Sequence, residues 1–150
     1  MPADEPATGV LPDWSRFLGR AGTVVTSPAR RCSVPGAAVD ARLRPWDLGA
    51  WVGRDLAELD LAGWRADPGY DEHGGETLQA LYDRVAGLLA DWHDRDDRLV
   101  AVTHAAVVKA AVVHALHAPV QATWDVDVAP SSATELHATP TGWRVVGVNR

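Results

Sequence analysis

Two short runs of β-branched and apolar residues, each ending in polar side chains, stand out along the chain. The first run extends from Thr23 to Thr26 and the second from Leu99 to His104. Short valine-rich runs of this kind are typical of buried strands. Each run leads directly into a segment with helical features, and the second is followed by the apolar stretch from Ala105 to His117. This alternation of strands and helices predicts an α/β fold with a parallel sheet.

The strongest helix signal lies between Glu76 and His93. Apolar residues recur there at intervals of three and four, which places them on one face of a helix. These residues are Leu78, Leu81, Tyr82, Val85, Leu88, Leu89 and Trp92. Glu76 would stand in the first turn, where a carboxylate suits the helix dipole. A second helix is predicted from Arg54 to Ala66, with Leu56, Leu59 and Trp64 on its apolar side, and a short helical piece around Trp14 to Leu18.

The candidate chemistry lies where the two predicted strands end. His104 comes at the carboxyl end of one strand, and the helix start behind it offers free N–H groups to an anion. After the other strand, Ser27 is expected to cap a helix with Pro28 at its first position, and Arg30 and Arg31 follow. Guanidinium groups bind phosphate oxygens in pairs, so an arginine and a histidine from two strand ends could share one phosphate.

Four motifs occur in an order that resembles the histidine phosphatase (phosphoglycerate mutase-like) superfamily. They are Ser27-Pro28-x-x-Arg31, Leu43-Arg44-x-x-x-Leu48-Gly49-x-Trp51-x-Gly53, Gly74-Gly75-Glu76-Thr77 with Arg84, and Val102-Thr103-His104. The segments 134–136 and 142–149 are similar to the last strand pair of that family. The resemblance spans roughly residues 22–149. It implies a single domain over residues 1–150 with a three-layer α/β fold, in which helices flank a mostly parallel central sheet.

The chain departs from this family at the expected nucleophile. Members open with a strand that ends in Arg-His-Gly, and no such sequence occurs here. The first histidine is His73, in a stretch from Glu72 to Thr77 that superficially imitates the motif. The turn-forming residues before it favour a loop and a helix start, and the alternative that His73 is the nucleophile stays open. Loss of the first strand would leave unpaired backbone groups in the sheet and lower its stability.

A second departure concerns the proton donor. Family enzymes commonly place a glutamate two positions after the leucine that corresponds to Leu43, and here that position is Pro45. Asp47 lies nearby, and would point to the same face only if the local register holds. Two central catalytic groups of the family are therefore absent or displaced.

The resemblance still implies roles for several residues. Arg31 corresponds to the arginine that grips the phosphate, and His104 to the second histidine that hydrogen-bonds the phosphoryl oxygens, so both are candidate catalytic groups. Arg30 and Glu76 are further candidates for phosphate binding, and Arg84 is a supporting residue. A pocket of this kind binds phosphate, but efficient turnover needs a histidine lone pair in line with phosphorus.

Three interpretations follow for the function. The chain is a phosphomonoesterase whose start is placed too far downstream, so that the missing strand is encoded upstream. Alternatively, it is a non-catalytic member that binds a phosphorylated metabolite or a partner protein. The third interpretation is weak hydrolysis through another group, with His104 as nucleophile or acid–base catalyst. Substrate specificity would come from the region between Gly53 and Gly74.

The amino-acid composition limits the classes of partner that the chain is expected to bind. A net charge of −6 and a pI near 5.4 argue against nucleic acid and anionic membranes, which need a basic face. The acidic amino-terminal residues resemble no signal peptide, and a single cysteine, Cys32, rules out an internal disulfide, as expected in the cytoplasm. His114 and His117 have spacing suited to a metal, but no third ligand is evident, so neither metal nor cofactor is expected. The expected partner is a small phosphorylated metabolite.

Overall fold

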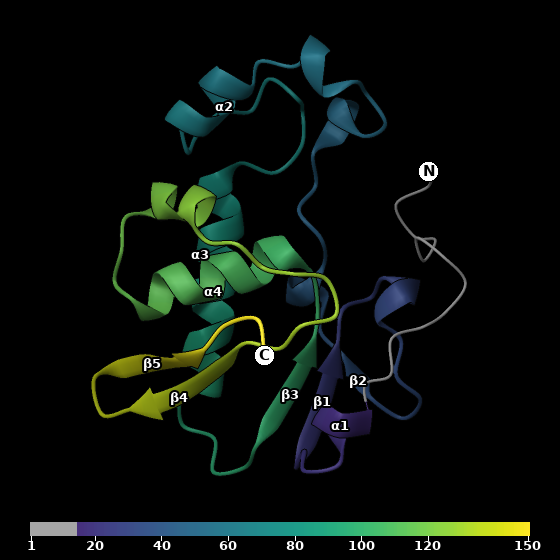
Figure 1. Ribbon diagram of the computed structural model, residues 1–150, viewed down its shortest axis with the longest axis vertical. Helices are drawn as coiled ribbons and strands as arrows, with labels where there is room; N and C mark the ends of the chain where they lie inside the picture. The colour runs from purple at the N-terminus through teal and green to yellow at the C-terminus, as the bar shows by residue number, and fades with distance from the viewer. Residues whose placement is uncertain (1–14) are drawn as a thin grey trace.

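The computed structural model describes residues 15–150, and a three-stranded parallel sheet forms its centre (Figure 1). The strand order is β2 (Ala38–Val39), β1 (Thr23–Thr26) and β3 (Leu99–Val102). In β1 and β3 the residues pair in register from Thr23 opposite Leu99 to Thr26 opposite Val102. Both strands predicted from the valine-rich runs are therefore confirmed. Because they are parallel, their carboxyl ends meet at one edge of the sheet, where open α/β folds place their ligands.

Two long helices pack against each other beside this sheet. They are α3 (Leu78–Trp92) and α4 (Ala105–Ala115). The side chain of Thr77 caps α3 by accepting a hydrogen bond from Ala80 N at 3.0 Å. Glu76 therefore precedes the cap, and its predicted place in the first helical turn is wrong. No helix in residues 15–150 combines the length and the apolar character needed to cross a bilayer.

The predicted helix from Arg54 to Ala66 is wrong in its first half. The structure has a 3₁₀ turn at Leu56–Glu58 and a separate helix, α2 (Leu61–Ala66). Asp55 and Asp60 each accept a backbone N–H of the residues that follow them, which starts two short segments instead of one helix. Leu56 is 67% exposed and so belongs to no buried face. The first predicted helix is α1 (Ser15–Leu18), and Trp14 lies outside the described residues.

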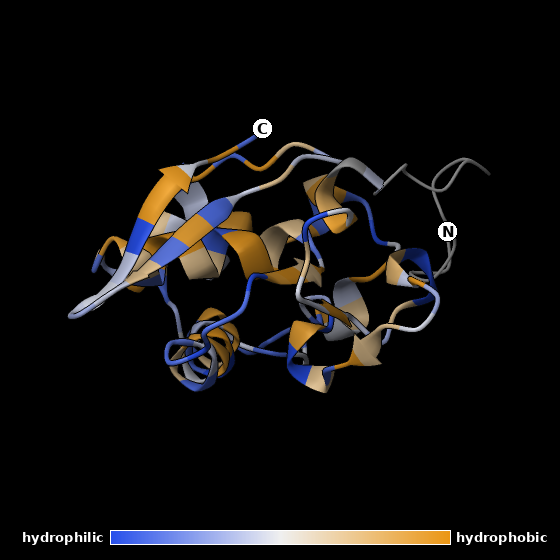
Figure 2. Cartoon of the chain, turned by 90° about the horizontal axis from the view of Figure 1, so that it is seen from below, coloured by the Kyte–Doolittle hydropathy of each residue, from blue (hydrophilic) through white to orange (hydrophobic). Residues whose placement is uncertain are grey.

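The chain ends in the predicted pair of strands, β4 (Glu135–Thr139) and β5 (Gly142–Gly147), which form an antiparallel hairpin. Hydrophobic and hydrophilic residues alternate along β4, whereas β5 carries Val145 and Val146 next to each other, and both kinds of residue appear along the hairpin (Figure 2). The hairpin is a sheet of its own, and within residues 15–150 β3 pairs with no strand other than β1. One edge of β3 is thus left without a strand partner within residues 15–150.

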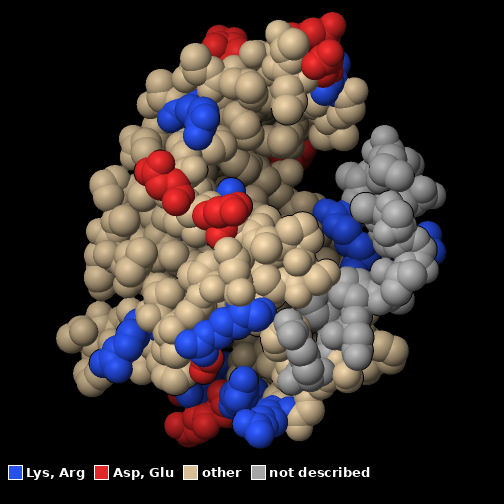
Figure 3. All heavy atoms as spheres, viewed as in Figure 1, with Lys and Arg blue, Asp and Glu red and all other residues tan. Residues whose placement is uncertain are grey.

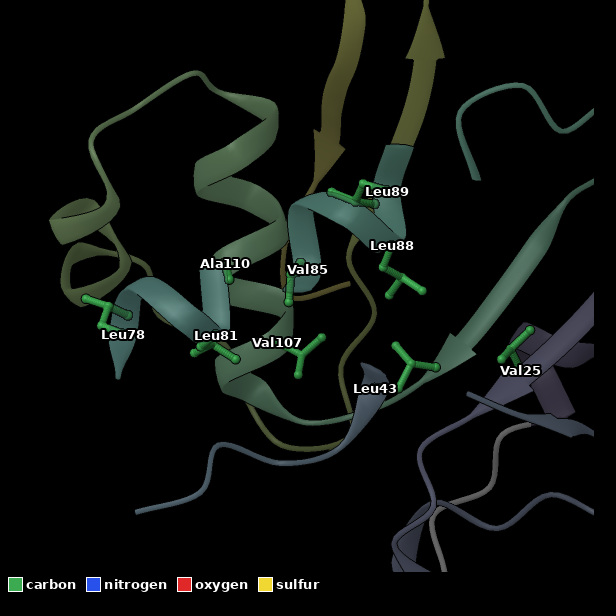
Figure 4. Packing of buried hydrophobic residues seen from close by; sticks show 9 residues of the cluster. All are labelled: Val25, Leu43, Leu78, Leu81, Val85, Leu88, Leu89, Val107 and Ala110. Atoms are coloured by element: carbon green, nitrogen blue, oxygen red, sulfur yellow. The ribbon is translucent and has the colours of Figure 1, made fainter. Parts of the chain in front are cut away.

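The hydrophobic core lies between α3, α4 and the central sheet (Figure 4). The stripe of apolar residues predicted on α3 supplies most of it, and Leu81 is completely buried. The core cluster consists of Val25, Leu43, Leu78, Leu81, Val85, Leu88, Leu89, Val107 and Ala110. Leu43 belongs to a 3₁₀ turn (Ala41–Leu43), so the core also fixes the segment that follows β2. This packing holds the strand ends and the adjoining turns in fixed positions.

Candidate anion-binding site

The ends of β1 and β3 bring a serine, an arginine and a histidine together. His104 follows β3, while Ser27 and Arg31 follow β1. The Oγ of Ser27 lies 2.7 Å from Nε2 of His104, and Nη2 of Arg31 lies 3.0 Å from Nδ1 of the same ring. Arg31 and His104, which the sequence analysis placed at the ends of two separate strands, are therefore in direct contact.

The donors and acceptors determine which nitrogen of His104 carries the proton. A guanidinium group donates hydrogen bonds and cannot accept them, so Nδ1 must be the acceptor of the bond from Arg31. A neutral imidazole then carries its proton on Nε2, which donates to Ser27 Oγ. The backbone N–H of Ala29 also donates to Ser27 Oγ, at 3.2 Å. The ring is thus held in one orientation between Arg31 and Ser27.

Ser27 does not cap a helix, contrary to the expectation from the sequence. The helical segment is a 3₁₀ turn (Arg30–Cys32) whose first flanking residue is Ala29, with no side-chain cap. Ser27 instead closes a tight turn through the N–H of Ala29, because a serine hydroxyl can reach the amide two residues ahead. This turn keeps the hydroxyl beside His104.

Cys32 is a site residue that sequence reasoning missed. Its side chain is buried, and its Sγ lies 3.7 Å from Nε2 of His104 and 3.8 Å from the carbonyl oxygen of Thr103. Burial raises the pKa of this thiol, and the opposing effects of the Arg31 charge and of Ser27 are smaller. The group is therefore a neutral thiol at pH 7 and a poor nucleophile. In the sequence, the one sign that Cys32 belongs to the site is its position directly after Arg31, in a segment that follows a predicted strand.

The amino end of α4 begins directly after His104. His104 is the residue before the helix, its side chain makes no capping bond, and the first backbone bond runs from Val108 N to the carbonyl of His104. The amides of residues 105–107 therefore lie at the open end of the helix, where the partial charge is positive. Together with a guanidinium and an imidazole, such an end is suited to an anion with several oxygens.

Glu76 and Arg84 form a buried ion pair close to this edge of the sheet. Both side chains are 9% exposed, and Arg84 Nε lies 2.6 Å from Glu76 Oε1, while Arg44 approaches the same carboxylate at 3.3 Å. Arg84 also donates to the carbonyls of Arg42 and Pro45. The carboxylate of Glu76 is therefore engaged by arginines, and the pair fixes the chain segment on either side of Leu43.

One hydrogen bond joins that segment to the strand end. Thr103 Oγ1 donates to the carbonyl of Leu43 at 2.8 Å.

Arg30 is exposed, and among the described residues no hydrogen bond or ion pair of its side chain is found. Arg30 is therefore exposed and Glu76 is buried in ion pairs. The predicted contact of each residue with phosphate stays a prediction.

Asp47, the carboxylate near the position of the expected proton donor, forms a hydrogen bond with the backbone. Asp47 is exposed, and its Oδ1 accepts the N–H of Gly49 at 2.9 Å, which closes a turn. The loops on either side lie against each other, with Glu76 N bonded to the carbonyl of Asp47 and Ala50 N to that of His73. Gly49 has φ +52°, and a Cβ there would lie 2.2 Å from the His73 carbonyl, so only glycine fits.

His73 is buried away from solvent in an aromatic cluster. It is 1% exposed, its Nδ1 accepts the N–H of Gly75, and its ring packs 5.2 Å from Trp51 and 5.8 Å from Tyr70. Other members of the cluster are Trp46, Trp64 and Trp124. The structure thus places His73 in a loop, as the sequence favoured. Within residues 15–150 no three His, Cys, Asp or Glu side chains gather in a way that could hold a metal.

Solved structures of phosphatases share this architecture. A mycobacterial glucosyl-3-phosphoglycerate phosphatase is 26% identical, with a TM-score of 0.69 over 90% of this chain and 81% of that one. The same enzyme in complex with VO₃ gives 25% identity and a TM-score of 0.72, over 90% and 80% of the two chains. A mutant phosphoserine phosphatase from Entamoeba histolytica, in complex with phosphoserine, is 15% identical over 90% and 77%, and its TM-score of 0.74 shows the common fold.

No curated protein matches the chain. The model of the histidine phosphatase superfamily (branch 1), however, matches residues 18–150, which is nearly the whole chain and includes both strand ends of the candidate site. The chain therefore belongs to the histidine phosphatase superfamily, branch 1.

Proposed function

We propose that this chain binds phosphomonoesters at the site formed by Ser27, Arg31, His104 and the amino end of α4. The observation that supports the proposal most directly is the contact of Arg31 and Ser27 with the two nitrogens of one imidazole. A guanidinium group, an N–H of a histidine and open helix amides are all donors, and a phosphoryl group offers only acceptors. The site matches that ligand in both charge and hydrogen bonding.

Each residue has a distinct part in this proposal. The guanidinium of Arg31 turns from the imidazole to two phosphoryl oxygens, and the Nε2–H of His104 turns from Ser27 Oγ to a third oxygen. Arg30, exposed on the same turn, meets the phosphate from the solvent side. Glu76 acts indirectly by holding Arg84 and Arg44, and with them the loop that borders the site.

We propose further that hydrolysis is slow or absent. Covalent transfer needs an imidazole lone pair in line with phosphorus, and the Arg-His-Gly sequence that carries the nucleophile in the family does not occur in this sequence. Of the other described histidines, His73 is buried in the aromatic cluster and none is found in contact with His104. The thiol of Cys32 is neutral, so it offers no replacement nucleophile.

The relatives support a small phosphorylated metabolite as the ligand class. Structures of the mycobacterial glucosyl-3-phosphoglycerate phosphatase contain VO₃ or inorganic phosphate, and the Entamoeba histolytica phosphatase mutant contains phosphoserine. Those ligands belong to the relatives, and they suggest probes for this chain.

Titration calorimetry with orthovanadate and inorganic phosphate tests the proposal. Loss of a charge-assisted hydrogen bond costs about 1.5–3 kcal/mol, so Arg31→Met and His104→Gln are each expected to weaken binding at least about tenfold. Arg144→Met, which removes an exposed arginine from β5, is the matched control and should leave affinity unchanged. Absence of any binding to the unaltered chain, or equal losses in all three variants, would contradict the proposal. Rapid turnover of p-nitrophenyl phosphate would contradict its second part.

A further inference from the structure

A series of hydrogen bonds continues from His104 into the protein interior. Arg31 Nη2 donates to Nδ1 of His104, and Nε2–H of the same ring donates to Ser27 Oγ. The hydroxyl of Ser27 in turn forms a side-chain hydrogen bond with the thiol of Cys32. Cys32 Sγ donates to the carbonyl oxygen of Thr103 at 3.8 Å. We call these five residues, from Arg31 to the Thr103 carbonyl, the relay.

The bonds of the relay all run in one direction. Ser27 Oγ accepts two hydrogen bonds, from Nε2 of His104 and from the backbone N–H of Ala29. A hydroxyl oxygen has two lone pairs and one proton, so the proton of Ser27 is left for the sulfur of Cys32. The proton of the thiol then goes to the Thr103 carbonyl, which can only accept. Every donor therefore points from Arg31 toward Thr103.

The inner end of the relay is shielded from water. Ser27 is 2% exposed and Cys32 is 4% exposed, whereas Arg31 and His104 are half-buried. Charged side chains lie at the surface in groups of both signs, as Figure 3 shows for one face, but Ser27 and Cys32 are uncharged. Buried polar groups of this kind depend on each other for hydrogen bonds. The direction of the relay is therefore set at its buried end.

Thr103 ties that buried end to the core. Its Oγ1 donates to the carbonyl of Leu43 at 2.8 Å, and Leu43 is 1% exposed within the core cluster. Thr103 also lies between the end of β3 and the start of α4, two elements whose positions the core fixes. A fixed acceptor at the end of a hydrogen-bonded series orients each donor before it.

The relay acquires its importance when Arg31 leaves the ring. In the proposed complex the guanidinium turns to the phosphoryl oxygens, and Nδ1 of His104 loses the donor that keeps it unprotonated. A neutral imidazole can then carry its proton on either nitrogen. Because the proton of Ser27 is engaged by Cys32, Ser27 still faces Nε2 as an acceptor. The ring proton therefore stays on Nε2, from which it is donated to the ligand.

We propose that Cys32 is a positioning residue for anion binding, which acts through Ser27 to keep the proton of His104 on Nε2. The thiol needs neither contact with the ligand nor a change in its oxidation state. This inference rests on the proposed phosphate binding for its effect on affinity. The protonation of the imidazole, however, is observable in the ligand-free protein.

¹⁵N NMR of the His104 ring in an Arg31→Met background tests the proposal without a ligand, at about pH 8, where an ordinary imidazole is neutral. Protonated and unprotonated ring nitrogens resonate far apart, and a ring that exchanges its proton gives intermediate values. Arg31→Met alone is expected to keep Nε2 protonated. Adding Cys32→Ala frees the Ser27 hydroxyl to donate to the ring, so both resonances should become intermediate.

Two further substitutions in the same background separate hydrogen bonding from packing. Cys32→Ser supplies a hydroxyl that donates and accepts as the thiol does, and it should retain the Nε2 proton. Val112→Ala removes buried methyl groups from α4, at a residue that is 3% exposed and outside the relay, and should retain it as well. Intermediate resonances in Arg31→Met alone, or an unchanged Nε2 proton after folded Cys32→Ala, would overturn the proposal.

An infrared measurement on the unaltered protein covers the case in which Cys32→Ala does not fold. The chain has one cysteine, so its S–H stretching band reports Cys32 alone. The band is expected at the lowered frequency of a thiol that donates a hydrogen bond, and Ser27→Ala should move it. A band at the frequency of a free thiol would contradict the relay.

Titration calorimetry with orthovanadate measures the consequence for binding. Cys32→Ala is expected to weaken binding about fivefold, the effect of one hydrogen bond, and Cys32→Ser to stay within about twofold of the unaltered chain. Equal losses in Cys32→Ala and Val112→Ala would contradict the proposed role. If the unaltered chain binds no vanadate, the proposed function fails, while the NMR result still decides whether Cys32 controls the ring proton.

Discussion

Single residues at the strand ends show how donor and acceptor roles decide the chemistry of a site. Arg31 and Arg84 are both largely enclosed by the protein, but Arg31 meets an imidazole whereas Arg84 meets a carboxylate. The first contact can be exchanged for a stronger one with an anion, because a neutral ring is a weaker partner than phosphate for a guanidinium. The second already neutralises both charges. We therefore assign ligand binding to Arg31 and structural support to Arg84.

Removing one member of the buried pair should be costly. Arg84→Met leaves the carboxylate of Glu76, 9% exposed, with only the more distant Arg44, and it removes the donors to two backbone carbonyls. An uncompensated buried charge costs about 3–5 kcal/mol in the free energy of unfolding, which urea denaturation measures. Arg54→Met breaks the exposed pair with Glu58 and should cost no more than about 0.5 kcal/mol. Similar losses in both variants would show that the Glu76–Arg84 pair is not effectively buried.

At the scale of elements, two histidines link helices to their neighbours and should respond to pH in opposite ways. His93 follows α3, and its Nε2 bonds to the carbonyl of Thr139 at the end of β4, while Nδ1 meets Asp94. Asp94 in the first place, and then the Thr139 carbonyl, raise the pKa of His93. His114 on α4 lies 3.2 Å from the hydroxyl of Tyr82 on α3. Burial, and to a lesser extent His117, lowers its pKa.

The signs of these shifts predict where each contact weakens. A raised pKa means that the contribution of His93 is complete below its ordinary pKa of 6.5 and is lost as pH rises through the raised value. The lowered pKa of His114 means that its contribution is complete above 6.5 and is lost as pH falls through the lowered value. Thermal unfolding between about pH 5 and pH 8.5 tests both effects. His93→Gln should abolish the alkaline loss alone, and His114→Gln the acidic loss alone; unchanged pH profiles in both variants would refute the assignment.

At the scale of the whole molecule, one core beside the sheet holds every element of the candidate site. Leu43 precedes the loop that Arg84 fixes, Val25 lies in β1, and Val107 lies in the first turn of α4, and all three belong to the same cluster. The strand ends and loops of the anion site therefore share one support. A loss of core packing should weaken anion binding.

Leu81 provides the sharpest test of that support. It is completely buried on α3, and Leu81→Ala is expected to destabilise the protein by about 2–5 kcal/mol, because it removes buried methyl groups and leaves a cavity. Leu56, 67% exposed, is the control, and Leu56→Ala should change the free energy of unfolding by at most about 0.5 kcal/mol. Urea denaturation measures both, and vanadate titration of folded Leu81→Ala should show weakened binding. Equal effects of the two substitutions would argue against a single core.

Local patterns were sufficient for most of the architecture. The valine-rich runs predicted β1 and β3, the three- and four-residue spacing predicted α3, and the closing strand pair was recognised by resemblance. These features depend on neighbours in sequence, through backbone preference and the face on which side chains lie. The predictions that were wrong, the helix from Arg54 and the cap at Ser27, failed where aspartate or serine side chains bonded to nearby amides and competed with helix formation.

Local sequence patterns were enough to predict the strands, the main helices and the place of Arg31 and His104 at one edge of the sheet, because parallel strands send their carboxyl ends to the same side. Three contacts emerge from the folded chain alone: Cys32 lies against His104, Arg84 holds Glu76, and β3 and β4 line the same cavity. Those contacts join residues that are distant in the chain or that face each other only once turns and loops are packed. Their geometry depends on the whole core, which no local pattern encodes.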